Sequence, residues 1–180
     1  MSKHCEMRLS GSGGQGLILA GIILAEAALL ENKNAIQSQS YGPEARGGAS
    51  KAEVIISDGE IDFPKVQTPD IVLALTQVAS DKYIKTVKPD GIVIVDDAIE
   101  LPADLRAGKV YKLPILDTAA EKVGKSIVAN IVAVGLLAEL TGVVSRKSVE
   151  DAVLARVPKG TEDLNRTALR EGYELALQSK

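Results

Sequence analysis

The stretch that decides the fold is residues 6–16, EMRLSGSGGQG, in which a short apolar and polar alternation runs into a cluster of glycines. The alternation predicts a strand over residues 6–10, and residues 15–31 then become helical with apolar side chains on nearly all sides. A strand, a glycine-rich turn and a helix in this order form the opening unit of doubly wound α/β folds. We therefore expect the chain to begin with such a unit.

Strands and helices continue to alternate along the chain. Two continuous apolar runs, residues 70–75 and 91–96, are typical of central parallel strands that are buried on both faces. The pattern predicts one Rossmann-like α/β domain over residues 1–180, with a largely parallel sheet flanked by helices and a helical C-terminal portion. The other predicted elements are strands at residues 35–38, 52–56 and 109–113 (the last at an edge) and helices at residues 79–87, 126–140, 145–156 and 162–178.

Two of the predicted helices, residues 15–31 and 126–140, have no clean polar face. A helix that is apolar all round must be covered on more than the side that faces its sheet. Either other chains cover part of the surface, or the fold buries both helices by itself. The sequence leaves both alternatives open.

Composition excludes several classes of protein. The 180 residues are 46% hydrophobic and carry a net charge of −3, so the chain can bury a core but has no electrostatic footprint for nucleic acid or an anionic membrane. The apolar stretch at residues 17–30 is shorter than the ~18–20 residues that a membrane span needs, and it contains Glu26. No export signal is visible, so we expect a cytoplasmic protein.

Cysteine and histidine are scarce, since Cys5 and His4 are the only ones. A Cys/His zinc site or a four-cysteine iron–sulfur site is therefore excluded, and we expect no metal in this chain. Cys5 is predicted to be an inert, partly buried thiol. Asp96 and Asp97 follow a buried strand, where paired carboxylates either bind Mg²⁺ or cap the next element, and capping is the more frequent use.

The glycine cluster is the first candidate binding site. Gly11, Gly13 and Gly16 match G-x-G-x-x-G between a strand and a helix, and the motif is completed by Ser12, Gly14 and Gln15. Glycines let backbone N–H groups approach an anion, to which the helix N-terminus adds partial positive charge. The alternative is a purely structural tight turn.

A nicotinamide dinucleotide is disfavoured as the ligand. Its recognition requires an acidic residue about 20 positions after the motif, at the end of the second strand. Glu31 has that spacing but falls on the end of the helix, and the strand itself ends without a carboxylate. Asn130, inside the second apolar helix, must find a hydrogen-bond partner, and it either orients a loop, meets a ligand or is a satisfied core amide.

Residues 40–48, SYGPEARGG, form the second candidate site. The guanidinium of Arg46 could bind phosphate or carboxylate, or could instead pair with Glu44 in a structural clasp. Gly47 and Gly48 permit close backbone approach, and Tyr41 could stack on an adenine or simply pack in the loop. Because this loop follows the second strand, we expect it at the same sheet edge as the first, near the crevice where open α/β sheets bind ligands.

Together the two loops resemble the gamma subunit of 2-oxoacid:ferredoxin oxidoreductases. The resemblance continues through Pro69-Asp70, Asp81-Lys82-Tyr83, Gly91, Asp96-Asp97, residues 128–131 and residues 140–142. It implies a complex in which alpha and beta subunits hold thiamine diphosphate and Mg²⁺, with iron–sulfur clusters in beta or in a ferredoxin-like delta subunit. The implied reaction converts a 2-oxoacid and coenzyme A into acyl-CoA and CO₂, with ferredoxin as the electron acceptor.

The resemblance also implies that the gamma-type chain helps to bind coenzyme A, has no catalytic residue and is inactive alone. The sequence of the second loop in this chain favours 2-oxoglutarate as the substrate. Substrate selectivity is expected to reside in the alpha and beta subunits. The alternatives are a stand-alone Rossmann-type nucleotide-binding protein and a scaffold without a ligand. The predicted binding residues are Gly11, Ser12, Gly13, Gly14, Gln15, Gly16, Tyr41, Arg46, Gly47 and Gly48.

Overall fold

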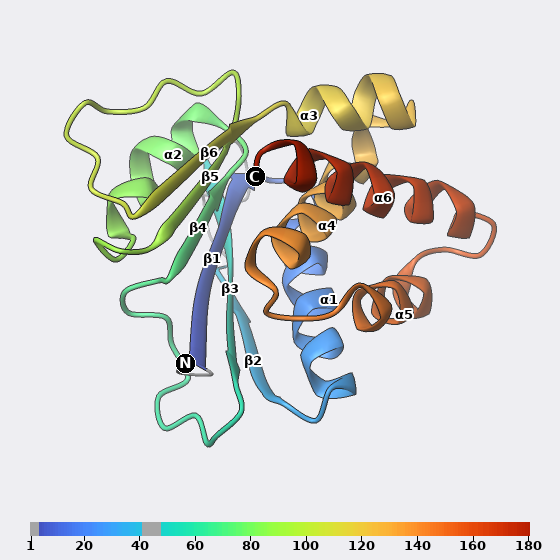
Figure 1. The fold of residues 1–180 in the computed structure, drawn as a ribbon, viewed down its shortest axis with the longest axis horizontal. Coiled ribbons are helices and arrows are strands. Elements are labelled where there is room, and N and C mark those ends of the chain that lie inside the picture. Colours follow the sequence, from blue (N-terminus) through green and yellow to red (C-terminus); the bar gives the residue numbers. More distant parts are fainter. Residues whose placement is uncertain (1–3, 41–47) are drawn as a thin grey trace.

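A computed structural model describes residues 4–40 and 48–180, in which a central sheet lies between two layers of helices (Figure 1). The strands are β1 (His4–Ser12), β2 (Asn34–Gln39), β3 (Ala49–Ser57), β4 (Ile71–Ala74), β5 (Ile92–Asp96) and β6 (Lys109–Leu113). The helices are α1 (Leu17–Leu30), α2 (Gln77–Tyr83), α3 (Ile115–Asp117), α4 (Ala129–Thr141), α5 (Arg146–Arg156) and α6 (Glu162–Gln178). Shorter helical turns are η2 (Ile84–Thr86), η3 (Thr118–Val123) and η4 (Ser126–Val128).

The six strands follow the order β2-β3-β1-β4-β5-β6. Strands β1, β4, β5 and β6 pair in parallel, whereas β3 is antiparallel to both of its neighbours, β1 and β2. The prediction of a largely parallel sheet is confirmed, and so is the edge position of β6. The antiparallel β3 has a simple cause: a parallel pair needs a crossover of a dozen or more residues, and the connection at residues 40–48 is shorter than that.

The chain changes direction at the middle of the sheet. After β1 it crosses through α1 to β2 on one side, and after β4 it crosses through α2 to β5 on the other side. The neighbouring carboxyl ends of β1 and β4 therefore mark a topological switch point. Open α/β sheets bind ligands in the crevice outside such a point.

The two faces of the sheet are covered differently. Helices α1, α4, α5 and α6 pack on one face around a large apolar core that includes Met7, Leu9 and Leu73. Helix α2 and η2 cover a smaller apolar cluster on the other face, around Val72 and Val93. Every residue from 129 to 138 is buried, because α1, α5 and α6 surround α4. Of the two alternatives for the apolar helices, the fold thus supplies most of the cover itself.

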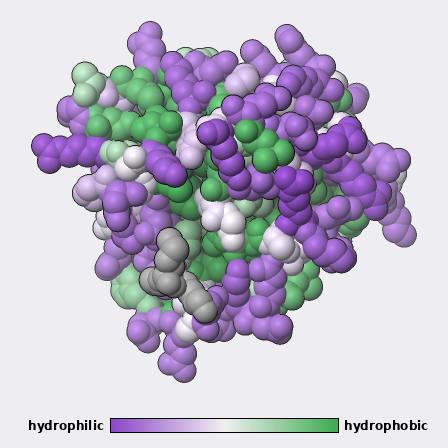
Figure 2. Space-filling model, in the orientation of Figure 1, coloured by the Kyte–Doolittle hydropathy of each residue, from purple (hydrophilic) through white to green (hydrophobic). Residues whose placement is uncertain are grey.

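The outer helices are amphipathic, as their sequences predict. Hydrophilic side chains crowd the surface on the side where α5 and α6 lie, and smaller hydrophobic areas occur elsewhere on the same face (Figure 2). Inside, glycine allows α4 and α6 to approach closely, since a Cβ atom on Gly135 would lie 2.5 Å from the carbonyl oxygen of Leu169. Within residues 4–40 and 48–180, no helix combines the length and the apolar character that crossing a membrane demands.

Candidate functional site

The glycine loop, residues 11–16, continues from the carboxyl end of β1 into α1. Gly16 adopts φ +73° as the N-cap of α1, a left-handed conformation that favours glycine. The Ser12 N–H donates to Oε1 of Gln15 at 2.8 Å, and the Gln15 N–H donates to the Ser12 carbonyl at 3.3 Å. A Cβ atom on Gly11 would collide with that Gln15 carboxamide. In this structure Gly11 therefore makes room for a side chain of the loop itself.

Asn130 connects the glycine loop to α4. Its buried side chain donates from Nδ2 to the Gly16 carbonyl oxygen at 3.1 Å, and the same oxygen accepts the Ala20 N–H at 3.0 Å. A Cβ atom on Gly16 would lie 2.5 Å from Nδ2 of Asn130. Among the alternatives for this residue, the structure thus shows a partnered buried amide that orients the loop.

Helices α1 and α4 lie parallel, and their N-termini converge. Asn130 joins their beginnings, while the Lys33 ammonium just after α1 donates to the carbonyl of Val143 just after α4 at 2.7 Å. A cavity of about 550 Å³ opens between the two N-termini, lined on one side by Gly14 and Gln15 and on the other by residues of α3, η3, η4 and α4. The positive ends of two helix dipoles favour a negatively charged group here, whereas Asp117 in the lining opposes one.

The second predicted loop lies only partly within the described residues. Tyr41, Arg46 and Gly47 are outside them, whereas Gly48 is described and half-buried. Ser12 pairs with Ala49 and Gln39 pairs with Ala52, so the two flanks of the loop reach the edge where the glycine loop begins. The contacts that Tyr41, Arg46 and Gly47 make with a ligand stay predictions.

Glu31 has a structural role. Its Oε1 accepts the Ser145 N–H at 2.6 Å and its Oε2 accepts the Lys33 ammonium at 2.9 Å. Burial opposes ionisation of this carboxyl, but the hydrogen bonds from Ser145 and Lys33 outweigh it and lower the pKa of Glu31 to about 2. The carboxylate is thus fixed at the start of α5, where it cannot recognise a ribose bound at the glycine loop.

Asp96 accepts backbone N–H groups from the turn after β5 and from α3, the helix that follows β6. Its Oδ2 accepts the Leu116 N–H at 2.9 Å and its Oδ1 accepts the Ala98 N–H at 3.2 Å. Asp96 thus has a structural role, but it bonds to the first turn of α3 and not, as had been expected, to the next element along the chain. Across residues 4–40 and 48–180, no group of three or more His, Cys, Asp or Glu side chains is arranged to hold a metal ion.

Cys5 is a half-buried residue of β1. Burial, with the charge of Asp70 adding to it, raises the pKa of the Cys5 thiol to about 12. Only the thiolate is a nucleophile or a metal ligand, so the protonated thiol is inert at neutral pH. The prediction of a partly buried thiol is confirmed, and the raised pKa agrees with the expectation that it is inert.

Sequence reasoning missed a charged cluster on the face of the sheet that α2 covers. Arg8 on β1 and Glu53 on β3 are partners in the strand register and are both buried. The sequence contained a signal for this cluster, because Arg8 and Glu53 each place a charge in an otherwise apolar strand. Pairing them, however, requires the register of two strands that lie 45 positions apart.

Comparison with known proteins gives consistent matches over the whole chain. The family described as "Pyruvate ferredoxin/flavodoxin oxidoreductase" matches residues 6–175. The 2-oxoglutarate synthase subunit KorC of Methanocaldococcus jannaschii is 54% identical over 174 residues, covering 95% of this chain and 93% of the relative. The pyruvate/ketoisovalerate oxidoreductases common subunit gamma of Pyrococcus furiosus is 34% identical over 177 residues, covering 94% of this chain and 95% of the relative.

Solved structures agree with these matches. A keto/oxoacid ferredoxin oxidoreductase gamma subunit from Geobacter sulfurreducens superposes with a TM-score of 0.88 at 51% identity, covering 98% of both chains. A 2-oxoglutarate:ferredoxin oxidoreductase from Magnetococcus marinus shares the fold, with a TM-score of 0.86 at 22% identity over all of this chain and 32% of that one. The resemblance indicated by the two loops is confirmed: the chain belongs to the pyruvate ferredoxin/flavodoxin oxidoreductase family.

Proposed function

We propose that this chain, as the gamma subunit of a 2-oxoglutarate:ferredoxin oxidoreductase, supplies part of the coenzyme A site of that complex. Several relatives that match nearly the whole chain carry the name 2-oxoglutarate synthase subunit KorC. In the proposed reaction, 2-oxoglutarate and coenzyme A give succinyl-CoA and CO₂ while ferredoxin is reduced. The part of this chain is to bind and orient coenzyme A.

The convergence of the α1 and α4 N-termini on one cavity is the observation that carries the proposal. The cavity lies beside the glycine loop at the carboxyl edge of β1, next to the topological switch point. Its volume of about 550 Å³ is within the range of small-molecule sites. Coenzyme A presents phosphate groups next to an adenosine, so its anionic end suits the positive ends of two helices.

The Gln15 carboxamide shows how an anion would enter the loop. It accepts the Ser12 N–H, which is one of the donors that a phosphate oxygen would use. The end of the Gln15 side chain is flexible, so a phosphate can replace its oxygen at Ser12 without moving the backbone. Gly14 and Gln15 line the cavity and would then flank the bound group.

The redox cofactors belong to other subunits in this proposal. The chain has one cysteine and one histidine, and the Cys5 thiol is held protonated, so its residues do not fit an iron–sulfur cluster. We therefore assign thiamine diphosphate, Mg²⁺ and the clusters to alpha, beta and ferredoxin-like delta subunits. Ferredoxin accepts the electrons from that assembly.

Steady-state kinetics of the assembled complex test the role of the glycine loop. Gly13→Val places a branched side chain where the anion would bind, so we expect the KM for coenzyme A to rise about tenfold or more. The KM for 2-oxoglutarate should not change. Gly59→Val is the control, because a Cβ atom on Gly59 would approach only the Ser57 hydroxyl, at 4.0 Å. If the KM for coenzyme A does not change in the Gly13 variant, the chain acts as a scaffold without a ligand role.

Arg46→Ala tests the second loop in the same assay. Arg46 is the only arginine between the two glycine motifs, so its loss should raise the KM for coenzyme A about tenfold while subunit assembly persists. An unchanged KM would contradict a phosphate role for Arg46. Titration of the isolated chain with NAD addresses the remaining alternative, since tight binding would indicate a stand-alone nucleotide-binding protein.

A further inference from the structure

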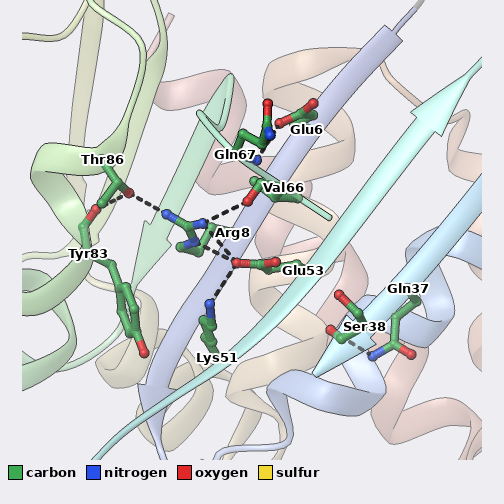
Figure 3. A network of polar contacts seen from close by, with 10 residues as sticks. All are labelled: Glu6, Arg8, Gln37, Ser38, Lys51, Glu53, Val66, Gln67, Tyr83 and Thr86. Carbon is green, nitrogen blue, oxygen red and sulfur yellow. Dashed lines mark hydrogen bonds and ion pairs between the residues drawn. The ribbon is translucent and has the colours of Figure 1, made fainter. Parts of the chain in front are cut away.

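A buried ion pair organises the sheet face on the α2 side (Figure 3). Arg8 on β1 lies opposite Glu53 on β3, and the Arg8 Nε donates to Oε1 of Glu53 at 2.9 Å. The other Arg8 nitrogens donate to the Thr86 hydroxyl at 2.7 Å and to the Val66 carbonyl at 3.3 Å. Each nitrogen of the guanidinium therefore has a partner, and the charge of Arg8 balances that of Glu53.

Lys51 brings a second cation to the same carboxylate. Its Nζ lies 3.0 Å from Oε1 of Glu53 and 5.7 Å from the centre of the Tyr83 ring. Because Arg8 already balances Glu53, the charge of Lys51 is an excess. Lys51 is also reachable, since its side chain is 26% exposed while Arg8 is buried. A third cation lies at the same ring, since the Lys82 ammonium is 5.3 Å from the Tyr83 ring centre.

A hollow of about 310 Å³ opens beside Lys51 at the carboxyl end of β2. Its lining includes the hydroxyl residues Ser38 and Ser40 and a second ammonium group, from Lys65. Ser38 is the register partner of Glu53, and in Figure 3 it lies on the neighbouring strand across from Lys51 and Glu53. The hollow therefore combines two cations with hydroxyl donors above a carboxylate that is already neutralised.

We propose that this hollow is an anion site for a phosphate group. The Lys51 and Lys65 ammonium groups would contact its oxygens, while Ser38 and Ser40 would donate hydrogen bonds, so that several oxygens are satisfied at once. The ion pair with Glu53 acts as a positioning device that holds the Lys51 ammonium at the rim of the hollow. The site lies on the face opposite α1, away from the glycine loop, and shares only Ser40 with the second loop of the proposed coenzyme A site.

Calorimetric titration of the full chain with inorganic pyrophosphate tests the site. Lys51→Met should weaken binding about tenfold or more, because it removes a charge-assisted contact. Lys51→Arg keeps the charge and should restore binding to within about threefold of the unchanged chain. Lys112→Met is the matched control, since it removes an exposed lysine on β6, at the opposite edge of the sheet. The Lys51 variants keep Arg8 on Glu53, so circular dichroism should show a native fold.

The assembled complex identifies the source of the phosphate. If the phosphate belongs to coenzyme A, Lys51→Met raises the KM for coenzyme A but not that for 3′-dephospho-coenzyme A. If both KM values stay unchanged while pyrophosphate binding is lost, the site serves a separate phosphate ligand. Equal pyrophosphate affinity of Lys51→Met and the unchanged chain, or no affinity in either, overturns the proposal. Neither result alters the outcome of Gly13→Val, so the two proposals fail separately.

Discussion

The two ends of α1 differ in how their backbone groups are satisfied. At the C-terminal end, the N–H groups of Glu31 and Lys33 both donate to the Ala28 carbonyl at 3.0 Å. Their side chains then bind the segment between α4 and α5, through the Ser145 N–H and the Val143 carbonyl. At the N-terminal end, the N-cap residue is Gly16, which has no side chain to accept a hydrogen bond from the first N–H groups of the helix. Its carbonyl accepts a hydrogen bond from the Asn130 side chain.

This difference suggests separate roles for the two ends of the same helix. The C-terminal end, called the closed end here, hydrogen-bonds to other parts of the chain and fixes how α1 packs against the helices that follow. The open end, the N-terminal one, follows directly on Gly14 and Gln15, which line the cavity that residues at the N-terminus of α4 also line. We therefore expect changes at the closed end to lower stability alone, and changes at the open end to lower both stability and coenzyme A binding.

Gly16→Ala should have the largest effect of these changes. It places a side chain at φ +73°, and its Cβ atom would collide with the Asn130 amide. The left-handed strain and the forced movement together should cost about 2–4 kcal/mol of the free energy of unfolding, measured with urea. In the complex the KM for coenzyme A should rise as well, because the loop changes shape.

Gly160→Ala is the control for Gly16→Ala. Gly160 also has positive φ, +90°, but a Cβ atom there meets nothing within 4 Å. It should therefore show only the conformational strain, about 1 kcal/mol, and no change in the KM for coenzyme A. Equal losses of stability in the two variants would show that the Asn130 contact does not constrain the loop.

Glu31→Ala should have the next largest effect. It removes the acceptor of the Ser145 N–H at the start of α5 and one partner of the Lys33 ammonium. The free energy of unfolding should fall by about 1–2 kcal/mol, as for the loss of a helix cap. The KM for coenzyme A in the complex should not change. A raised KM would mean that the two ends of α1 are not independent.

The acid dependence of stability isolates the charge of Glu31. Its folded-state pKa, about 2, lies below the ordinary 4.5, so the ionised carboxylate stabilises the fold above about pH 4.5, and this contribution disappears as the pH falls toward 2. Glu31→Gln should therefore be less stable than the unchanged chain at neutral pH, and the gap should close in acid. Glu174→Gln, an exposed change on α6, should show no such closing gap. Urea unfolding at several pH values measures both.

Much of the fold follows from local patterns in the sequence. Continuous apolar runs identified β4 and β5, and the amphipathic repeat identified α5 and α6 with bounds close to those observed. The antiparallel direction of β3 was not predicted; the short connection at residues 40–48 requires it once β3 is known to pair with β2. The cover of α4 could not be derived, because it depends on how helices from distant parts of the chain pack in space.

The candidate site was predictable only in outline. The spacing of glycines located the loop between β1 and α1, but it did not show that two of them also make room for side chains of the chain itself. Gly11 accommodates Gln15, which depends on a rotamer, and Gly16 accommodates Asn130, which is 114 positions away. Such contacts depend on tertiary packing that no local pattern encodes.

The smallest effect we predict is the one that tests the open end most directly. Asn130→Ala removes one of two hydrogen bonds to the Gly16 carbonyl, which keeps the Ala20 N–H, so the free energy of unfolding should fall by only about 1 kcal/mol. The same change frees the space that the Cβ atom of Gly16→Ala needs. The double variant should therefore lose less stability than the sum of the single ones, by about 0.5–2 kcal/mol. If the losses in the free energy of unfolding are strictly additive, the glycine loop and α4 are not energetically coupled. The contact between Asn130 and Gly16 would then not fix the spacing of the two helix N-termini.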